Sequence, residues 1–271
     1  MKKESLDIID CCDTNTVQSF LNIFTFMYDK LIELQEGLSN LELCSLLEID
    51  HYFNMIFIFA YTWGVGGNLF EQEGNLGRTK FSQHIKLKFL SLYAPTPQED
   101  ELFNYYVDLE NIKMRPWKTM MPDYVYDPQQ AFFNIVVPTI ETVKYKYLLD
   151  NLVKLGFNTL IIGNSGAGKS NVVSEFLNNL EGTQFIYKQL NFSAQTSAQN
   201  FQDVFTDKHK FIRYKRDLIG APYTKKNLVF IDDINMPMPE QSGAQPPIEL
   251  LRQIIGHGGF FELKKINYNY L

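Results

Sequence analysis

Apolar residues recur at three- and four-residue spacing through residues 15–60, a period that predicts amphipathic helices. A second helix is expected to begin after Gly37. Residues 55–65 are the most apolar stretch, but they are fewer than the about 20 apolar residues that cross a bilayer, so we predict a buried helix and no membrane segment. Another amphipathic segment spans residues 81–93. The apolar residues that define the first of these helices are Leu21, Phe24, Met27, Tyr28, Leu31, Ile32 and Leu34.

Glycines and prolines divide the chain that follows. Residues 94–101 are acidic and contain proline, which predicts a turn or linker. Prolines also interrupt residues 115–128, for which we expect an extended segment packed on a surface. These breaks indicate a helical region at 1–93, an extended linker at 94–134 and a third region at 135–271. The glycines expected to interrupt the helices are Gly64, Gly66, Gly67, Gly74 and Gly77.

After residue 135 short apolar runs alternate with segments of helical period. Such alternation predicts an α/β fold, with a parallel sheet and helices on its faces. Thr139 and Ser197 each precede a helix and can cap it, and Pro247 is expected at the first position of the last helix. The predicted strands are 158–163, 184–191 and 227–232, and the predicted helices are 140–155, 169–180, 198–207 and 247–255.

The composition supports a sizeable core, because 45% of residues are hydrophobic and 14% are aromatic. The net charge of −6 is unfavourable for a protein built mainly to hold nucleic acid. Cations nevertheless gather near the third predicted strand. We interpret them as a solvated face or a face toward an acidic neighbour, with a nucleic-acid groove as the alternative. This basic cluster comprises Lys208, Lys210, Arg213, Lys215, Arg216, Lys225 and Lys226.

Three cysteines bear on the compartment. Cys11, Cys12 and Cys44 show no C-x-x-C spacing and no accompanying histidines, which argues against a disulfide framework or a zinc site. The basic N-terminus is followed by no apolar segment of the kind found in secretory signals. We therefore expect a cytoplasmic protein.

The strongest chemical signal is a complete G-x-x-x-x-G-K-S motif between a predicted strand and a predicted helix, the context of a P-loop. Its glycines let backbone N–H groups turn toward phosphate oxygens, and the helix N-terminus favours an anion. Lys169 is expected to reach the β- and γ-phosphates as a catalytic residue, and Ser170 to ligate Mg²⁺. The predicted nucleotide-binding residues are Gly163, Asn164, Ser165, Gly166, Ala167, Gly168, Lys169, Ser170 and Asn171.

A second signal is the acidic pair that ends the third predicted strand. Four apolar residues, 228–231, precede Asp232 and Asp233. Asp232 is placed to hold the Mg²⁺ shell, as a Walker-B aspartate does. Asp233 takes the position of the catalytic base that orients the attacking water, which is glutamate in many hydrolysing P-loop proteins.

These motifs together resemble the third AAA+ module of axonemal dynein heavy chains. The resemblance rests on VVPTIETVKYKYLLDNL, GNSGAGKS, NFSAQTSA, VFIDDINMP and GAQPPIELLRQIIGHGGFFEL, and it covers most of the chain. Upstream, FIFAYTWGVGGN resembles the end of the second module and its helical lid. Axonemal third modules also resemble this chain in carrying Asp at the position of Asp233. The chain is therefore expected to hold a lid followed by a partial P-loop domain.

The resemblance implies a place in a ring of six AAA+ modules that drives microtubule-based movement in the axoneme of cilia and flagella. It implies ATP or ADP with Mg²⁺ as cofactors. The implied partners are the other modules of the heavy chain and, through the full motor, dynein intermediate and light chains and microtubules; no nucleic acid or membrane is implied. An adenine pocket would be lined by Val136, Val137, Pro138 and Thr139.

The resemblance also implies the sheet order 5-1-4-3-2, and only strands one to three are predicted before Leu271. Strands one and three would then present unpaired edges. The fourth strand carries the γ-phosphate sensor, and the arginine finger, worth about 10³–10⁵ in rate, would come from a neighbouring module. We expect the full motor to be the ATPase and this chain alone to hydrolyse ATP negligibly.

The sequence leaves three other interpretations open. One is a structural nucleotide-binding module without hydrolysis, in which Asp233→Asn would leave turnover in a full ring unchanged. Another is an inert truncated fragment. A third is an AAA+ initiator or helicase loader acting on DNA, which only the basic cluster favours and which salt-sensitive DNA retention would reveal.

Overall fold

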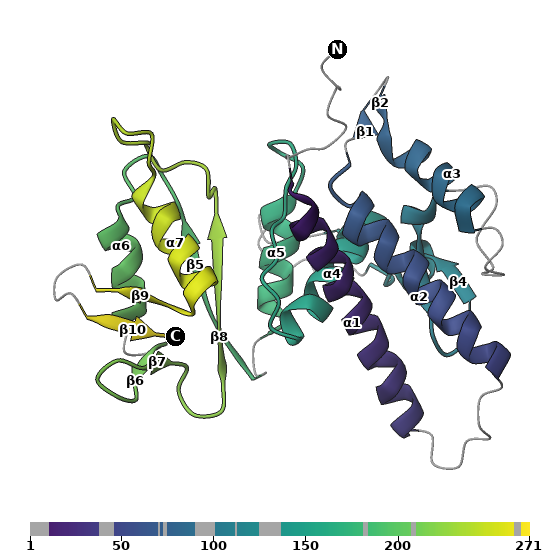
Figure 1. Cartoon of the computed structure of the whole chain (residues 1–271), viewed down its shortest axis with the longest axis horizontal. Helices are drawn as coiled ribbons and strands as arrows, with labels where there is room; N and C mark the ends of the chain where they lie inside the picture. The colour runs from purple at the N-terminus through teal and green to yellow at the C-terminus, as the bar shows by residue number, and fades with distance from the viewer. Residues whose placement is uncertain are drawn as a thin grey trace. The chain divides into compact units, whose positions relative to one another are not determined.

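The computed structural model describes residues 11–37, 46–69, 71–72, 75–89, 101–111, 113–124, 137–180, 184–206, 210–262 and 267–271 (Figure 1). It contains two compact units, residues 1–172 and 173–271. Mixed helices and strands, including a parallel strand pair, confirm the predicted α/β class. Val136, Gly74, Lys208 and parts of the predicted linker (94–100, 112 and 125–134) lie outside the described residues.

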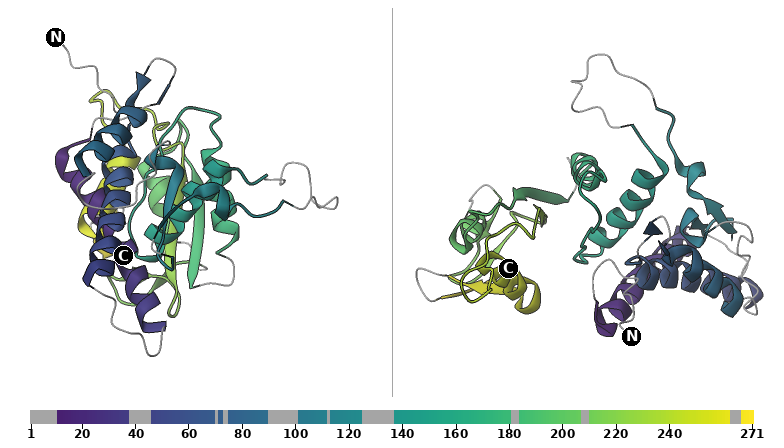
Figure 2. Two further views of the ribbon diagram at one scale, coloured as in Figure 1. Left: turned by 90° about the vertical axis from the view of Figure 1, so that its right-hand side faces the viewer. Right: turned by 90° about the horizontal axis from the view of Figure 1, so that it is seen from above.

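Two long helices form the centre of the first unit. Helix α1 (Asp13–Gly37) packs against α2 (Leu46–Gly66), as the two further views show (Figure 2). The predicted apolar helix is part of α2, where Met55 and Ile56 are fully buried, which confirms a core role. Among the described residues, no helix is both long enough and apolar enough to span a membrane.

A glycine expected to interrupt the helix instead lies inside it. A Cβ at Gly64 would lie 2.4 Å from Phe20 Cα of the facing helix, so glycine is required for the close approach of α1 and α2. Gly66 is the last residue of α2, and a Cβ there would meet the Phe81 ring at 2.5 Å. The sequence pattern marked the glycines correctly but could not show which one serves packing.

Gly64→Ala should therefore destabilise the first unit. The added methyl group forces α1 and α2 apart, at a cost of about 1–3 kcal/mol in the free energy of unfolding. The matched control is Gly256→Ala in another helix, where a Cβ meets nothing within 4 Å. There alanine should be neutral or stabilising by up to about 1 kcal/mol. Urea unfolding followed by circular dichroism measures both, and equal effects would contradict the packing role of Gly64.

Two antiparallel strand pairs and two short 3₁₀ turns complete this unit. Strands β1 (Glu71–Gln72) and β2 (Asn75–Leu76) precede α3 (Gly77–Phe89), and β3 (Tyr105–Asp108) pairs antiparallel with β4 (Lys113–Pro116). The turn η2 (Leu102–Asn104) precedes β3, and η3 (Trp117–Met120) follows β4.

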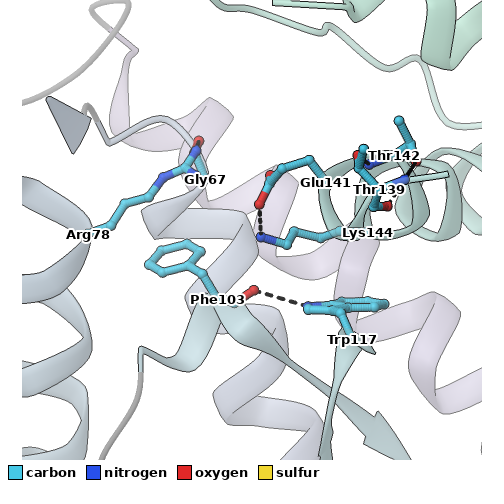
Figure 3. Close-up of polar contacts among 8 residues, drawn as sticks. All are labelled: Gly67, Arg78, Phe103, Trp117, Thr139, Glu141, Thr142 and Lys144. Carbon is cyan, nitrogen blue, oxygen red and sulfur yellow. Dashed lines mark hydrogen bonds and ion pairs between the residues drawn. The ribbon is translucent and has the colours of Figure 1, made fainter. Parts of the chain in front are cut away.

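The segment packs against the rest of the unit at Trp117, as expected, but there it forms a turn of 3₁₀ helix and is not extended. This side chain is 0% exposed, and its indole N–H donates to Phe103 O at 3.0 Å (Figure 3). The ring packs against Tyr106 and Tyr147 with centroids 5.3 Å away in each case. Prolines predicted the irregular backbone, but the partner that buries the ring comes from distant sequence.

Helix α4 (Ile140–Lys154) joins the same core. It ends one residue before the predicted boundary, and Gly156 follows with a φ of +82°. Tyr147 packs edge-on to Phe26 and donates its hydroxyl to Met27 Sδ at 3.7 Å. Burial raises the pKa of Tyr147 above its ordinary value, with a smaller contribution from Tyr106.

The strand predicted at 158–163 is not formed. A strand exists through hydrogen bonds to a neighbour, and no strand in the described ranges pairs with this segment. Leu160 is consequently 63% exposed. The neighbours expected for this strand are strands four and five, which are not among the elements predicted for the chain.

The second unit is built on one parallel pair. Strand β5 (Phe185–Asn191) pairs with β8 (Lys226–Asp232), from Phe185↔Lys226 to Asn191↔Asp232. This confirms that the second and third predicted strands are parallel neighbours. Helix α5 (Lys169–Asn178) leads toward β5, while α6 (Ala198–Asp203) and α7 (Pro246–His257) pack on the pair through a shared apolar cluster. The core of that cluster is Phe192, Phe201, Phe205, Phe211, Ile219, Leu250 and Phe260.

The capping residues predicted the first residues of α6 and α7, except that α7 begins one residue earlier than predicted. Ser197 Oγ accepts from Asn200 N at 3.1 Å, as expected of a cap. Helix α7 begins at Pro246, so Pro247 is its second residue and not its first, because Gln245 takes the cap position. Helix α6 ends at Asp203, where η5 (Val204–Thr206) continues.

Two short hairpins complete this unit. Strand β6 (Ile212–Arg213) pairs with β7 (Ile219–Gly220), and β9 (Gly259–Phe261) pairs with β10 (Tyr268–Tyr270). Two cations of the basic cluster serve the fold: Arg213 donates to Asn269 Oδ1 at 2.9 Å and Lys210 to Tyr187 O at 2.6 Å. The cluster is therefore partly structural.

Candidate nucleotide-binding site

The glycine-rich loop 163–168 turns tightly before α5. Gly166 and Gly168 have φ values of +77° and +79°, which favour glycine, and a Cβ on either would meet nothing within 4 Å. Lys169 begins α5 and folds back over the loop. Its Nζ donates to Gly163 O at 2.9 Å and to Asn164 O at 2.7 Å. The loop therefore surrounds the lysine ammonium at the N-terminus of α5. The ammonium and the helix N-terminus both favour an anion at this place.

The first turn of α5 presents the remaining predicted P-loop residues. Ser170 is half-buried and Asn171 is exposed, while Val172 and Val173 face the interior. The apolar side of the helix thus fixes its rotation, and the polar side stays accessible. A serine hydroxyl in this position is a hard oxygen ligand of the kind that Mg²⁺ takes alongside phosphate oxygens.

The segment predicted to line the adenine pocket leads into α4. Thr139 Oγ1 accepts from Thr142 N at 3.2 Å and Thr142 Oγ1 accepts from Thr139 N at 2.8 Å, which forms a capping box (Figure 3). Val137 is 54% exposed. One turn further, Lys144 Nζ lies 2.7 Å from Glu141 Oε1. The cap fixes the start of α4 directly after residues 137 and 138.

The acidic pair lies at the carboxyl end of β8, in the second unit. Asp232 O accepts from Phe192 N at 3.0 Å, which extends the β5–β8 pairing. Asp233 has a φ of +53°, in the left-handed region, and its N–H donates to Asp232 Oδ1 at 3.1 Å. The two predicted carboxylates are thus adjacent and oriented by a tight turn, with Asp233 exposed.

Sequence reasoning missed one residue near this pair. Gln245 Nε2 donates to Pro237 O at 2.6 Å and lies 3.5 Å from Asn235 O, and Met238 N donates to Ala194 O at 3.3 Å. These contacts tie together the segments after β5, after β8 and before α7. The GAQPP sequence was the available signal, but it predicted only a helix start.

The donor set fits a magnesium nucleotide better than a metal held by protein alone. In the described parts of the chain, no group of three or more His, Cys, Asp or Glu residues gathers as a metal site. Magnesium bound with phosphates uses only one or two protein ligands, and a serine hydroxyl and an aspartate carboxylate are each oxygen ligands of that kind. The loop 163–168 lies in the first unit and the acidic pair in the second.

Comparisons with known proteins agree with this class of protein. The P-loop containing dynein motor region matches residues 124–271, and the dynein heavy chain AAA lid domain matches residues 1–119. The fold and the matched regions define a P-loop module of the AAA type preceded by a lid. The chain belongs to the dynein heavy chain family.

Curated relatives include several axonemal heavy chains. Human dynein axonemal heavy chain 6 is 35% identical over 78% of this chain, and human dynein axonemal heavy chain 1 is 32% identical over 96%. The Chlamydomonas reinhardtii dynein-1-beta heavy chain of the flagellar inner arm I1 complex is 34% identical over 80%. The chain spans only 5% to 6% of the length of these relatives.

Proposed function

We propose that this chain is a nucleotide-binding part of an axonemal dynein motor, holding ATP or ADP with Mg²⁺. The observation that carries the proposal is the loop of positive-φ glycines closed over Lys169 at the start of α5. Such a loop suits a polyphosphate. The chain would comprise the end of the second AAA+ module and the first strands of the third. Its partners would be the other modules, intermediate and light chains and microtubules in the ciliary or flagellar axoneme.

The residues divide the work by chemistry. Backbone N–H groups of residues 163–168 would surround the phosphates, while Lys169 would exchange its two carbonyl partners for phosphate oxygens. Residues 136–139 would contact the adenine. Ser170 and Asp232 would hold Mg²⁺, which neutralises phosphate charge when bound. Asp233 would accept a hydrogen bond from the attacking water in the full motor.

A nucleotide holder that does not hydrolyse is the second candidate. It is favoured by an aspartate at the position of the base, one methylene shorter than glutamate, on an exposed residue. Asp233→Asn in the full-length motor separates the two, because loss of turnover at this site supports hydrolysis and unchanged turnover supports holding alone.

Asp232→Asn tests the carboxylate role directly. Removing the charge should leave nucleotide affinity without Mg²⁺ unchanged and reduce the enhancement by Mg²⁺ at least about tenfold, since a charged ligand is lost. Titration with a fluorescent ADP analogue, with Mg²⁺ and with EDTA, measures both. The control is Asp203→Asn on α6. In this variant Mg²⁺ should enhance nucleotide affinity as much as in the wild type. An unchanged enhancement in Asp232→Asn would remove Asp232 from the site.

A further inference from the structure

The segment that carries the acidic pair is held in an unfavourable backbone conformation. Asp233 adopts a φ of +53°, and its C=O accepts from Met236 N at 3.0 Å, which closes a turn. Its N–H donates to Asp232 Oδ1 at 3.1 Å. A non-glycine residue in the left-handed region persists where its surroundings restrain it. The turn that holds Asp233 beside Asp232 therefore depends on the contacts that restrain residues 233–238.

Gln245 supplies that restraint from outside the segment. Its amide nitrogen faces two carbonyl oxygens, those of Pro237 at 2.6 Å and Asn235 at 3.5 Å. A glutamine amide can donate to two acceptors, whereas a carboxylate in its place could donate to none. Pro237 is buried, so loss of this donor would leave a carbonyl with poorer access to water.

Gln245 is itself fixed by the core. Its C=O accepts from Ile248 N at 2.9 Å and from Glu249 N at 3.1 Å in the first turn of α7. Leu250 of this helix is buried in the cluster that contains Phe192 and Phe201. A rigid helix thus presents the amide to the segment after β8. The side chain does not cap α7, although it occupies the cap position.

We infer that Gln245 is a positioning residue for the acidic pair: it holds residues 233–238 in the turn that orients Asp232 and Asp233. This inference rests on the proposed function, in which Asp232 contributes to Mg²⁺ binding. The Gln245 side chain bonds the carbonyl oxygens of Asn235 and Pro237, so its effect should pass through the turn that carries the carboxylates. Its loss should weaken the contribution of Mg²⁺ to nucleotide affinity, and not nucleotide affinity itself.

The test compares three variants of the full 271-residue chain by titration with a fluorescent ADP analogue, with Mg²⁺ and with EDTA. Gln245→Ala should reduce the Mg²⁺ enhancement about three- to tenfold and leave the affinity in EDTA unchanged. Gln245→Glu has the same shape but repels both carbonyl oxygens, so it should reduce the enhancement at least as much. The matched control is Gln253→Ala on the same helix, whose Oε1 accepts from Phe261 N at 3.2 Å; it should retain the full enhancement.

The outcomes separate the inference from the proposed function. If the wild-type chain binds no nucleotide, the proposed function fails. If it binds with a Mg²⁺ enhancement that Gln245→Ala and Gln245→Glu both preserve within twofold, only the inference is overturned. An equal loss of affinity with Mg²⁺ and with EDTA also overturns it, since that pattern indicates general damage to the fold. Thermal unfolding midpoints of all three variants identify such damage independently.

Discussion

Replacing Lys169 by alanine should reduce nucleotide affinity at least about a hundredfold. The ammonium makes two short hydrogen bonds to Gly163 O and Asn164 O at the mouth of the loop, where it would meet the β- and γ-phosphates. Each charge-assisted hydrogen bond contributes about 1.5–3 kcal/mol, so losing two of them costs at least about 3 kcal/mol of binding free energy. Titration with a fluorescent ATP or ADP analogue measures the loss.

The control for this variant is another lysine of the same unit. Lys154 lies at the end of α4, 57% exposed, with its Nζ 2.7 Å from Asp150 Oδ2. An exposed ion pair contributes about 0–1 kcal/mol, so Lys154→Ala should change neither folding nor binding appreciably. A loss of affinity in Lys154→Ala equal to that in Lys169→Ala would show that the site is elsewhere or that binding is only electrostatic.

Replacing Trp117 by alanine should produce the largest loss of stability. The side chain is fully buried against Phe59, Tyr106 and Tyr147, so truncation leaves a large cavity and an unpaired carbonyl at Phe103. Such a change costs about 3–5 kcal/mol in the free energy of unfolding. Urea unfolding followed by far-ultraviolet circular dichroism measures it in the first unit.

Two further variants separate packing from hydrogen bonding at this position. Trp117→Phe keeps most of the ring contacts and loses the N–H donor, so it should cost about 1–3 kcal/mol. Leu87→Ala, at a side chain 75% exposed on α3, should change the free energy of unfolding by less than about 0.5 kcal/mol. A cost below about 1 kcal/mol for Trp117→Ala would show that Trp117 is not part of the core.

Local sequence signals predicted the elements whose causes are local. The caps at Thr139 and Ser197 fixed the starts of α4 and α6, and the apolar run before Asp232 predicted β8 to within one residue. The glycine turn before α5 and the start of that helix at Lys169 also follow from local residues. These features depend only on neighbouring residues, so they can be predicted from the sequence.

Features that depend on distant partners were not predictable in this way. The segment 158–163 has the apolar composition of a strand, but no described strand supplies its hydrogen bonds. The need for glycine at position 64 comes from the close approach of Phe20. The buried indole N–H of Trp117 is paired by the carbonyl of Phe103. Gln245 bonds residues 8 and 10 positions earlier in the same connection between β8 and α7, and its immediate neighbours indicated only a helix start. In each case the decisive contact is to a residue beyond the immediate sequence neighbours, which local patterns do not reveal.

Amide hydrogen exchange of the 271-residue chain, with and without Mg²⁺ and ATP, tests the central claim most directly. If both segments serve one nucleotide, the nucleotide slows exchange in residues 163–171 and in residues 232–238, and Lys169→Ala abolishes both effects. The hairpin of β6 and β7, remote in sequence from both segments, serves as the internal reference and should not change. Protection of neither segment at saturating nucleotide, or of only one, would contradict a single nucleotide site served by the P-loop and the acidic pair.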